Sequence, residues 1–179
     1  QLSSMFRFDG EGRVTRYKLG AGSTYTAATG YFETLVKNLD GSFTLAQKDK
    51  TTYTFKLISG TPFLVVGPVY RLTKIVDRIG NTTTFTYAAG NLTGVTDTYG
   101  RSLTFTYTAQ KKVASVTDPA GRVVSFTYDS TGRKLTKVTD PNGKTIQYTY
   151  NTLYQLTSKV DKDGRTFSYA YTSNRPVAV

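Results

Sequence analysis

The stretch that decides the fold is LTKVTDPNGKTIQYTY, residues 135–150. Two runs of alternating apolar and polar residues flank the tetrapeptide Asp140-Pro141-Asn142-Gly143. Alternation of this kind is typical of a β-strand with one buried face. In the tetrapeptide, Asp accepts local backbone N–H bonds, Pro fixes φ at the second position and Gly adopts a positive φ at the fourth. The stretch therefore predicts one β-hairpin.

The same pattern occurs five times from residue 71 onward, at intervals of 20, 21, 22 and 21 residues. The turn aspartates are Asp77, Asp97, Asp118, Asp140 and Asp161. The glycines three residues after them are Gly80, Gly100, Gly121, Gly143 and Gly164. The tyrosines ten residues after them are Tyr87, Tyr107, Tyr128, Tyr150 and Tyr171. Two fixed offsets kept five times identify an internal repeat, and we assign these residues a structural role.

The residues between each glycine and its tyrosine put aromatic and β-branched side chains on one strand face and Thr, Ser and Gln on the other. A single hairpin of this size buries too little apolar surface to offset its conformational entropy, so neighbouring hairpins must pair with one another. The predicted fold class is all-β. Antiparallel β-hairpin repeats are expected to form a continuous curved sheet, because sheets of this width curl or close.

The chain is predicted to divide into an irregular β region with degenerate repeats, residues 1–69, and a five-repeat region, residues 70–179, that ends in an incomplete strand. Residues 6–14 form a degenerate unit in which residues 9–12 supply the Asp-x-x-Gly turn. Further turns are expected at Asp40-Gly41 and at residues 48–50.

Two other segments of the first region are less regular. Residues 21–30 are small, polar and rich in glycine, so we expect a loop there. Residues 61–68 form an apolar run between two prolines, and either a buried edge strand or an exposed patch for a partner fits this pattern.

Composition argues against catalysis. The 179 residues include no Cys and no His, which removes disulfides, thiolate metal sites, cysteine nucleophiles and the commonest general base. Paired carboxylates remain, but Asp161 and Asp163 lie in one turn, where solvation or calcium is the ordinary outcome. We expect no enzyme activity, no catalytic residue, no metal site and no cofactor. No apolar run approaches the roughly 20 residues that cross a bilayer.

The net charge of +11, from 23 Lys and Arg against 12 Asp and Glu, leaves two interpretations open. The basic residues keep the solvated sheet face soluble, or they bind an acidic partner such as a glycan. Non-specific adsorption to nucleic acid is expected at most, because the aromatic residues share the core face. The weak candidates for a binding site are the basic residues directly after the turn glycines and two tyrosines, namely Arg101, Arg122, Lys144, Arg165, Tyr99 and Tyr154.

These repeats resemble the YD repeats of Rhs proteins. That signature is a leucine-led strand, an Asp-x-x-Gly turn followed by Arg or Lys, and a second strand ending in Tyr or Tyr-Asp; the resemblance covers about residues 40–175. Asn81 replaces the basic residue in the first unit, and only Tyr128 is followed by Asp. YD-repeat proteins include polymorphic toxin shells, Tc toxin components, wall-associated proteins and teneurins, so the resemblance implies a secreted or cell-surface location.

The resemblance implies a structural, non-catalytic β-scaffold. Two forms stay open: a segment of an Rhs-type shell within a longer parent chain, or a self-assembling fibre or ring subunit. Residues 175–179 represent half a hairpin, and an unfinished strand exposes backbone groups that a partner strand can pair with. The expected partners are therefore further repeats or other copies joined by β-strand addition. A carbohydrate- or acidic-partner-binding adhesion module is the alternative function.

Overall fold

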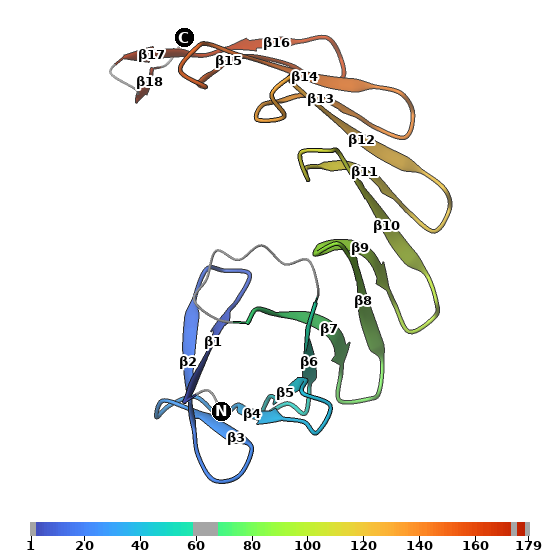
Figure 1. The fold of residues 1–179 in the computed structure, drawn as a ribbon. Helices are drawn as coiled ribbons and strands as arrows, with labels where there is room; N and C mark the ends of the chain where they lie inside the picture. The colour runs from blue at the N-terminus through green and yellow to red at the C-terminus, as the bar shows by residue number, and fades with distance from the viewer. Residues whose placement is uncertain (1–2, 59–67, 173–174, 178–179) are drawn as a thin grey trace. The chain divides into compact units, whose positions relative to one another are not determined.

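A computed structural model describes residues 3–58, 68–172 and 175–177, the last three without their side chains. Every regular element in these residues is a strand, and strands β1–β16 follow one another in chain order in a single antiparallel sheet (Figure 1). Strands β17 and β18 form a separate two-stranded sheet. The predicted all-β class and the succession of hairpins are confirmed.

The chain divides into two compact units, residues 1–102 and 103–179. The strands up to the division are β1 Ser4–Phe8, β2 Val14–Leu19, β3 Thr24–Ala27, β4 Thr34–Lys37, β5 Phe43–Ala46, β6 Thr52–Leu57, β7 Tyr70–Val76, β8 Thr82–Ala88 and β9 Asn91–Thr96. The division falls after the first residue of β10 Ser102–Tyr107. The strands after it are β11 Val113–Thr117, β12 Val123–Tyr128, β13 Leu135–Thr139, β14 Thr145–Tyr150, β15 Leu156–Val160, β16 Thr166–Ser168, β17 Ala170–Thr172 and β18 Arg175–Val177.

Most of the hairpins close with the same turn. In the turn between β13 and β14, the N–H of Gly143 donates to the carbonyl of Asp140 at 3.0 Å, and the N–H of Asp140 donates to the carbonyl of Lys144 at 2.9 Å. The fourth residue has a left-handed φ, which is 79° at Gly143. The degenerate unit follows the same scheme, since the N–H of Gly12 donates to the carbonyl of Asp9 at 3.1 Å. Its predicted Asp-x-x-Gly turn is confirmed.

The first unit contains the fully buried core. Tyr17, Tyr25, Leu35, Phe43 and Leu45 are buried on one face of the sheet. The ring of Phe43 lies edge-on to the rings of Tyr25 and of Tyr70, with centroids 5.7 and 4.7 Å apart. Within this unit the sheet bends (Figure 1). Residues of β1, β2 and β4–β8 line an apolar cavity of about 580 Å³.

The expected loop over residues 21–30 is wrong. Residues Thr24–Ala27 form β3, which pairs with β2 and β4. The reason is tertiary, because the ring of Tyr25 is only 1% exposed and packs on Phe43, and this burial outweighs the turn-forming residues on either side. Of the apolar run at residues 61–68, only Pro68 is within the described residues, so neither interpretation of that run is tested.

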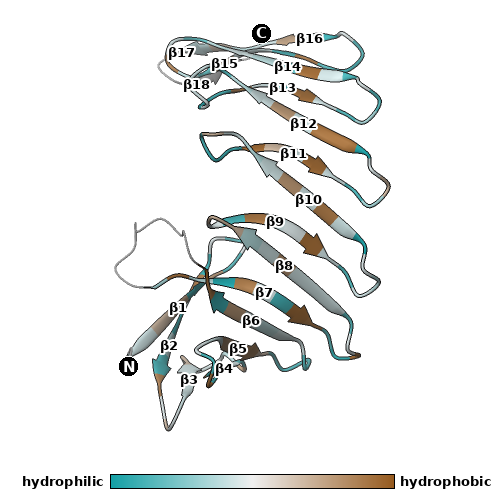
Figure 2. Cartoon of the chain, turned by 45° about the vertical axis from the view of Figure 1, so that its right-hand side comes forward, coloured by the Kyte–Doolittle hydropathy of each residue, from teal (hydrophilic) through white to brown (hydrophobic). Residues whose placement is uncertain are grey.

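In the second unit, the strand face that carries the aromatic and β-branched side chains is half-buried, and we call this face the aromatic stripe. Directly paired residues share a face, and the register aligns Phe105 with Val116, Val116 with Val124, and Phe126 with Val138. Figure 2 shows hydrophobic stretches recurring on β10–β13 between hydrophilic turns. Among the described residues of this unit, no hydrophobic side chain is fully buried. The stripe is therefore a single layer that nothing in the described chain covers completely.

Candidate functional site

The predicted basic binding residues lie directly after the Asp-x-x-Gly turns, where each arginine pairs with the aspartate of its own turn. In the turn between β11 and β12, Oδ1 of Asp118 accepts the N–H groups of Ala120 and Arg122, both at 2.9 Å. Its Oδ2 accepts Nε of Arg122 at 2.6 Å and forms an ion pair with Nη2 at 2.5 Å. One carboxylate thus holds two backbone amides and the guanidinium.

The same arrangement recurs in other turns of the series. Oδ2 of Asp97 accepts Nε of Arg101 at 2.7 Å, and Oδ2 of Asp161 accepts Nε of Arg165 at 3.1 Å. In the first of the five repeats, Asn81 takes the place of the basic residue, and Nδ2 of Asn81 donates to Oδ2 of Asp77 at 2.8 Å. In these turns, the side chain of the residue after the glycine donates to the turn carboxylate, whether that residue is a charged arginine or the neutral Asn81.

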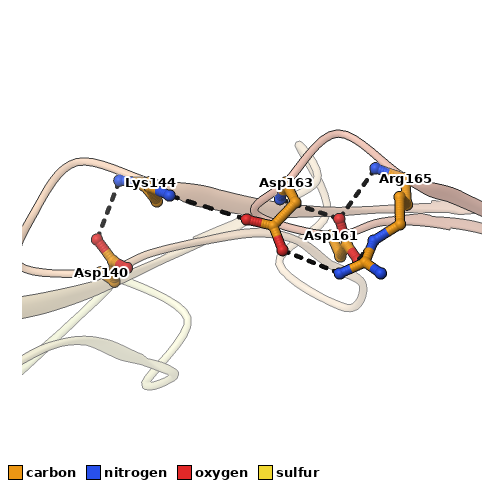
Figure 3. Close-up of polar contacts among 5 residues, drawn as sticks. All are labelled: Asp140, Lys144, Asp161, Asp163 and Arg165. Carbon is orange, nitrogen blue, oxygen red and sulfur yellow. Dashed lines mark hydrogen bonds and ion pairs between the residues drawn. The ribbon is translucent and has the colours of Figure 1, made fainter.

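Lys144 differs because it reaches the next turn (Figure 3). Its Nζ lies 3.8 Å from Oδ1 of Asp163, and Oδ2 of Asp163 accepts Nη2 of Arg165 at 3.0 Å. Asp163 thus lies between two cations from consecutive turns. Because these side chains are largely exposed, the ion pairs contribute little stability individually.

In three of the repeats, the tyrosine closes the opposite end of the hairpin. The hydroxyl of Tyr87 donates to the carbonyl of Leu72 at 2.8 Å, that of Tyr128 to Val113 at 3.0 Å, and that of Tyr150 to Leu135 at 2.9 Å. Each acceptor lies 15 residues earlier, on the first strand of the same hairpin. These three hairpins are consequently held at one end by the turn aspartate and at the other by a tyrosine hydroxyl.

A β-bulge accompanies these tyrosines. The pairing of β8 with β9 shifts between Thr86 and Tyr87, and that of β12 with β13 shifts between Thr127 and Tyr128. The same shift precedes Tyr107 and Tyr150. A bulge redirects the side chain that follows it, so the repeat contains an irregularity that recurs with the tyrosine.

The family model for the RHS repeat matches residues 71–102, 88–123, 107–134 and 128–166, and its matches follow the repeat of turns and tyrosines described above. The chain belongs to the RHS-repeat family. The predicted resemblance is confirmed, and the chain is a structural scaffold of the RHS type.

A solved structure of the Tc holotoxin pore of Photorhabdus luminescens is similar to this RHS-repeat chain, with 15% sequence identity and a TM-score of 0.44. The similarity covers 97% of this chain but 11% of the other, so the chain spans only a small part of that protein's length. No curated protein matches the chain significantly.

The two candidate tyrosines of the RHS-repeat chain lie in different kinds of turn. Tyr99 is 79% exposed beside an Asp-x-x-Gly glycine, and the guanidinium of Arg101 lies 5.4 Å from its ring centre. Tyr154 is 53% exposed in the turn between β14 and β15. Within the second unit, this turn lies at the opposite end of the strands from the turns that carry Arg122 and Arg165.

Four basic residues that the sequence analysis did not select lie in turns at the same end of the strands as Tyr154. They are Lys111 and Lys112, between β10 and β11, and Arg133 and Lys134, between β12 and β13. In the sequence they form two adjacent pairs. The signal that would have found them is their separation of 22 residues, which matches the repeat interval between Asp118 and Asp140.

Among the residues that the structure describes, no three His, Cys, Asp or Glu side chains lie close enough together to hold a metal ion. The same residues include no helix long and apolar enough to cross a membrane.

Hydrogen bonding and charge lower the pKa of most turn aspartates. The side chain of Arg101 holds the pKa of Asp97 below its usual 3.8, and the side chain of Arg122 does the same for Asp118. For Asp161, partial desolvation raises the pKa, but the N–H groups of Arg165 and Asp163 together with the Arg165 charge outweigh it. In each case the folded chain favours the ionised carboxylate.

Stability is therefore expected to fall in acid. A carboxylate whose pKa is lower in the folded than in the unfolded chain stabilises the fold above the unfolded value, here 3.8, and loses this effect as the pH falls through the folded value. The urea midpoint is expected to be constant between about pH 7 and pH 5 and to decrease below about pH 4.

The variant Asp118→Asn is the matched control for this effect. It keeps an oxygen that accepts the two backbone amides but loses the charge that pairs with Arg122. Its midpoint at neutral pH is expected to be lower, and its decrease in acid smaller. A wild-type midpoint that stays constant down to about pH 2 would contradict the role assigned to these carboxylates.

Proposed function

We propose that this RHS-repeat region is a non-catalytic segment of an extracellular or cell-surface shell, of the kind associated with toxins. Its sheet continues into further repeats of a longer parent chain or into other copies by strand addition. The observation that carries the proposal is that hairpins of the repeat are held at both ends by the same recurring bonds, from the turn aspartate and from the tyrosine hydroxyl, while their aromatic face stays half-buried.

The bonding within each repeat favours a static wall. The turn aspartate and the tyrosine hydroxyl act on backbone groups, so they fix the path of the chain rather than present reactive side chains. The half-buried stripe of the second unit is apolar surface that a neighbouring layer or repeat would cover. For Arg101, Arg122, Lys144 and Arg165, the geometry supports a role in holding the turns together instead of glycan binding.

The first strand offers an edge where strand addition can occur. Strand β1 is the outer strand of the described sheet and pairs only with β2. Phe6 and Phe8 on it are 56% and 72% exposed, and Val14, opposite Phe8, is 49% exposed. An edge strand with exposed apolar residues is a template for pairing with another strand.

This edge is expected to drive association. Sedimentation velocity of the chain at increasing concentration should show a species larger than the monomer. The variant Phe8→Lys places a charge on the edge and is expected to weaken this association by about tenfold or more.

The control is Phe32→Lys, since Phe32 is 75% exposed but lies between β3 and β4 and is not part of the edge strand. It should associate like the wild type. A chain that stays monomeric at every concentration, or a Phe32→Lys variant as impaired as Phe8→Lys, would contradict strand addition at β1.

A further inference from the structure

The apolar cavity of the first unit has two arginines in its wall. Its volume of about 580 Å³ lies within the range of pockets that hold small organic molecules. Most of the wall is apolar, with Met5, Leu35 and Leu45 among its residues. Arg7 of β1 and Arg71 of β7 belong to the same wall. The cavity therefore combines a large apolar surface with a small number of charged donors.

Both arginines have a donor that the protein leaves without a partner. Within the part of the chain that the structure describes, Nε of Arg7 and Nε of Arg71 are buried and donate to no acceptor. Buried N–H groups of this kind are costly and uncommon in folded proteins. A carboxylate that binds a guanidinium with two parallel hydrogen bonds can take Nε as one of the two donors, after a rotation of the side chain.

The two arginines differ in how their charge is balanced. Nη1 of Arg7 forms an ion pair with Oε2 of Glu33 at 3.2 Å, and Glu33 also accepts the hydroxyl of Tyr17. In the described ranges of the chain, no carboxylate forms an ion pair with Arg71. The described wall residues also include no Asp or Glu. The wall thus carries one positive charge in excess, on Arg71.

We propose that this cavity binds a fatty acid or a similar amphiphilic monocarboxylate. The carboxylate pairs with Arg71, whose single unbalanced charge matches a single negative charge. The hydrocarbon chain lies against the apolar wall and is held by the burial of its surface. This inference goes beyond the structural role proposed above, because it assigns a small ligand to the first unit.

The cavity is accessible from the side of β1. Phe6 and Phe8 belong to its wall, and they are 56% and 72% exposed. The wall is therefore open to solvent at this strand, and a flexible hydrocarbon chain can enter between these side chains.

The wall disfavours ligands of other classes. The hydroxyl of Ser4 already accepts two N–H groups of Arg16. The hydroxyl of Tyr87 already donates to the carbonyl of Leu72. A sugar or a peptide would bring several hydroxyl or amide groups into a wall whose hydroxyls are engaged in this way. A neutral hydrocarbon would leave Arg71 unbalanced, and an alkylammonium would add a second positive charge beside it.

The experiment is calorimetric titration of the chain with decanoate, and with decanol and decyltrimethylammonium, which keep the hydrocarbon chain but change the head group. The variant Arg71→Gln removes the unbalanced cation. The matched control Arg78→Gln removes the same charge from the exposed turn between β7 and β8, outside the cavity wall. Circular dichroism establishes that each variant remains folded.

The wild type is expected to bind one decanoate per chain, at least about tenfold more tightly than decanol or decyltrimethylammonium. Arg71→Gln should lose about tenfold or more in affinity for decanoate but less than about threefold for decanol, because the apolar wall is unchanged. Arg78→Gln should bind like the wild type.

A second variant tests the apolar part of the site. Met5→Trp places a larger side chain in the wall and should weaken binding of both decanoate and decanol, whereas Met5→Leu conserves volume and should not. Equal affinities of the wild type for decanoate and decanol would overturn the proposal, and this comparison needs no variant to fold. So would equal losses in Arg71→Gln and Arg78→Gln, or the absence of saturable decanoate binding.

Discussion

Replacing Phe43 with alanine is expected to lower the free energy of unfolding of the first unit by about 3–5 kcal/mol. Phe43 is 3% exposed and joins three strands, because its ring packs edge-on to Tyr25 of β3 and to Tyr70 of β7. Alanine leaves a cavity between these rings that the sheet cannot close without moving β3 or β7. Urea unfolding, with hydrogen exchange of β3–β7 as a local readout, measures the loss.

The control for this prediction is Leu39→Ala. Leu39 lies in the turn between β4 and β5 and is fully exposed, so its removal is expected to change stability by less than about 0.5 kcal/mol. If Phe43→Ala and Leu39→Ala gave similar losses, the packing assigned to the core of the first unit would be wrong.

Replacing Gly132 with alanine is expected to destabilise the second unit by about 2–3 kcal/mol. Gly132 has a φ of 69°, where a side chain is strained, and its added Cβ would lie within 2.8 Å of the Gln110 side chain. Gly121 has a similar φ of 78° but has open space around it. Gly121→Ala should therefore cost only the backbone strain, about 1–2 kcal/mol.

A double variant separates the two contributions at Gly132. Shortening the neighbouring side chain with Gln110→Ala removes the Cγ that the new methyl group meets at 2.8 Å but keeps the Cβ at 3.0 Å. It should therefore recover a part of the loss that exceeds the loss in Gly121→Ala. Thermal unfolding of the wild type, of Gly132→Ala, of Gln110→Ala and of the double variant measures this coupling, with Gly121→Ala as the comparison. Equal losses for Gly132→Ala and Gly121→Ala, with no recovery in the double variant, would exclude close packing between the two turns.

The sequence predicted the hairpins because their turns are encoded locally. Asp118 and Gly121 carry all the chemistry that the turn between β11 and β12 requires, and the alternation after Gly121 specifies which face of β12 is apolar. The same chemistry identified the degenerate turn at Asp9. A pattern whose cause lies within a few residues can be read without knowledge of the fold.

Features that depend on distant residues could not be predicted in this way. Residues 24–27 form a strand because Phe43 buries Tyr25, and no local signal in a glycine-rich segment reports that contact. The bulges before the tyrosines depend on the register of the next strand, which two-residue alternation does not specify. The acceptor for the Tyr128 hydroxyl likewise becomes apparent only when the hairpin is formed.

The candidate site shows the same limit. A basic residue four positions after four of the five turn aspartates suggested a charged rim, but Arg101, Arg122 and Arg165 each pair with the carboxylate of their own turn. Conversely, Lys112 and Arg133 are separated along the chain, and only the pairing of neighbouring hairpins brings their turns together.

The closure of each hairpin by its own aspartate and tyrosine has a consequence for how such chains change length. The bonds from Asp118 and Tyr128 begin and end within one repeat, as do those from Asp140 and Tyr150. Duplication or loss of a whole repeat by recombination would therefore leave these bonds intact in the repeats that remain. A deletion that cut through a repeat would separate its turn from its tyrosine, so this architecture is suited to evolve in steps of about one period.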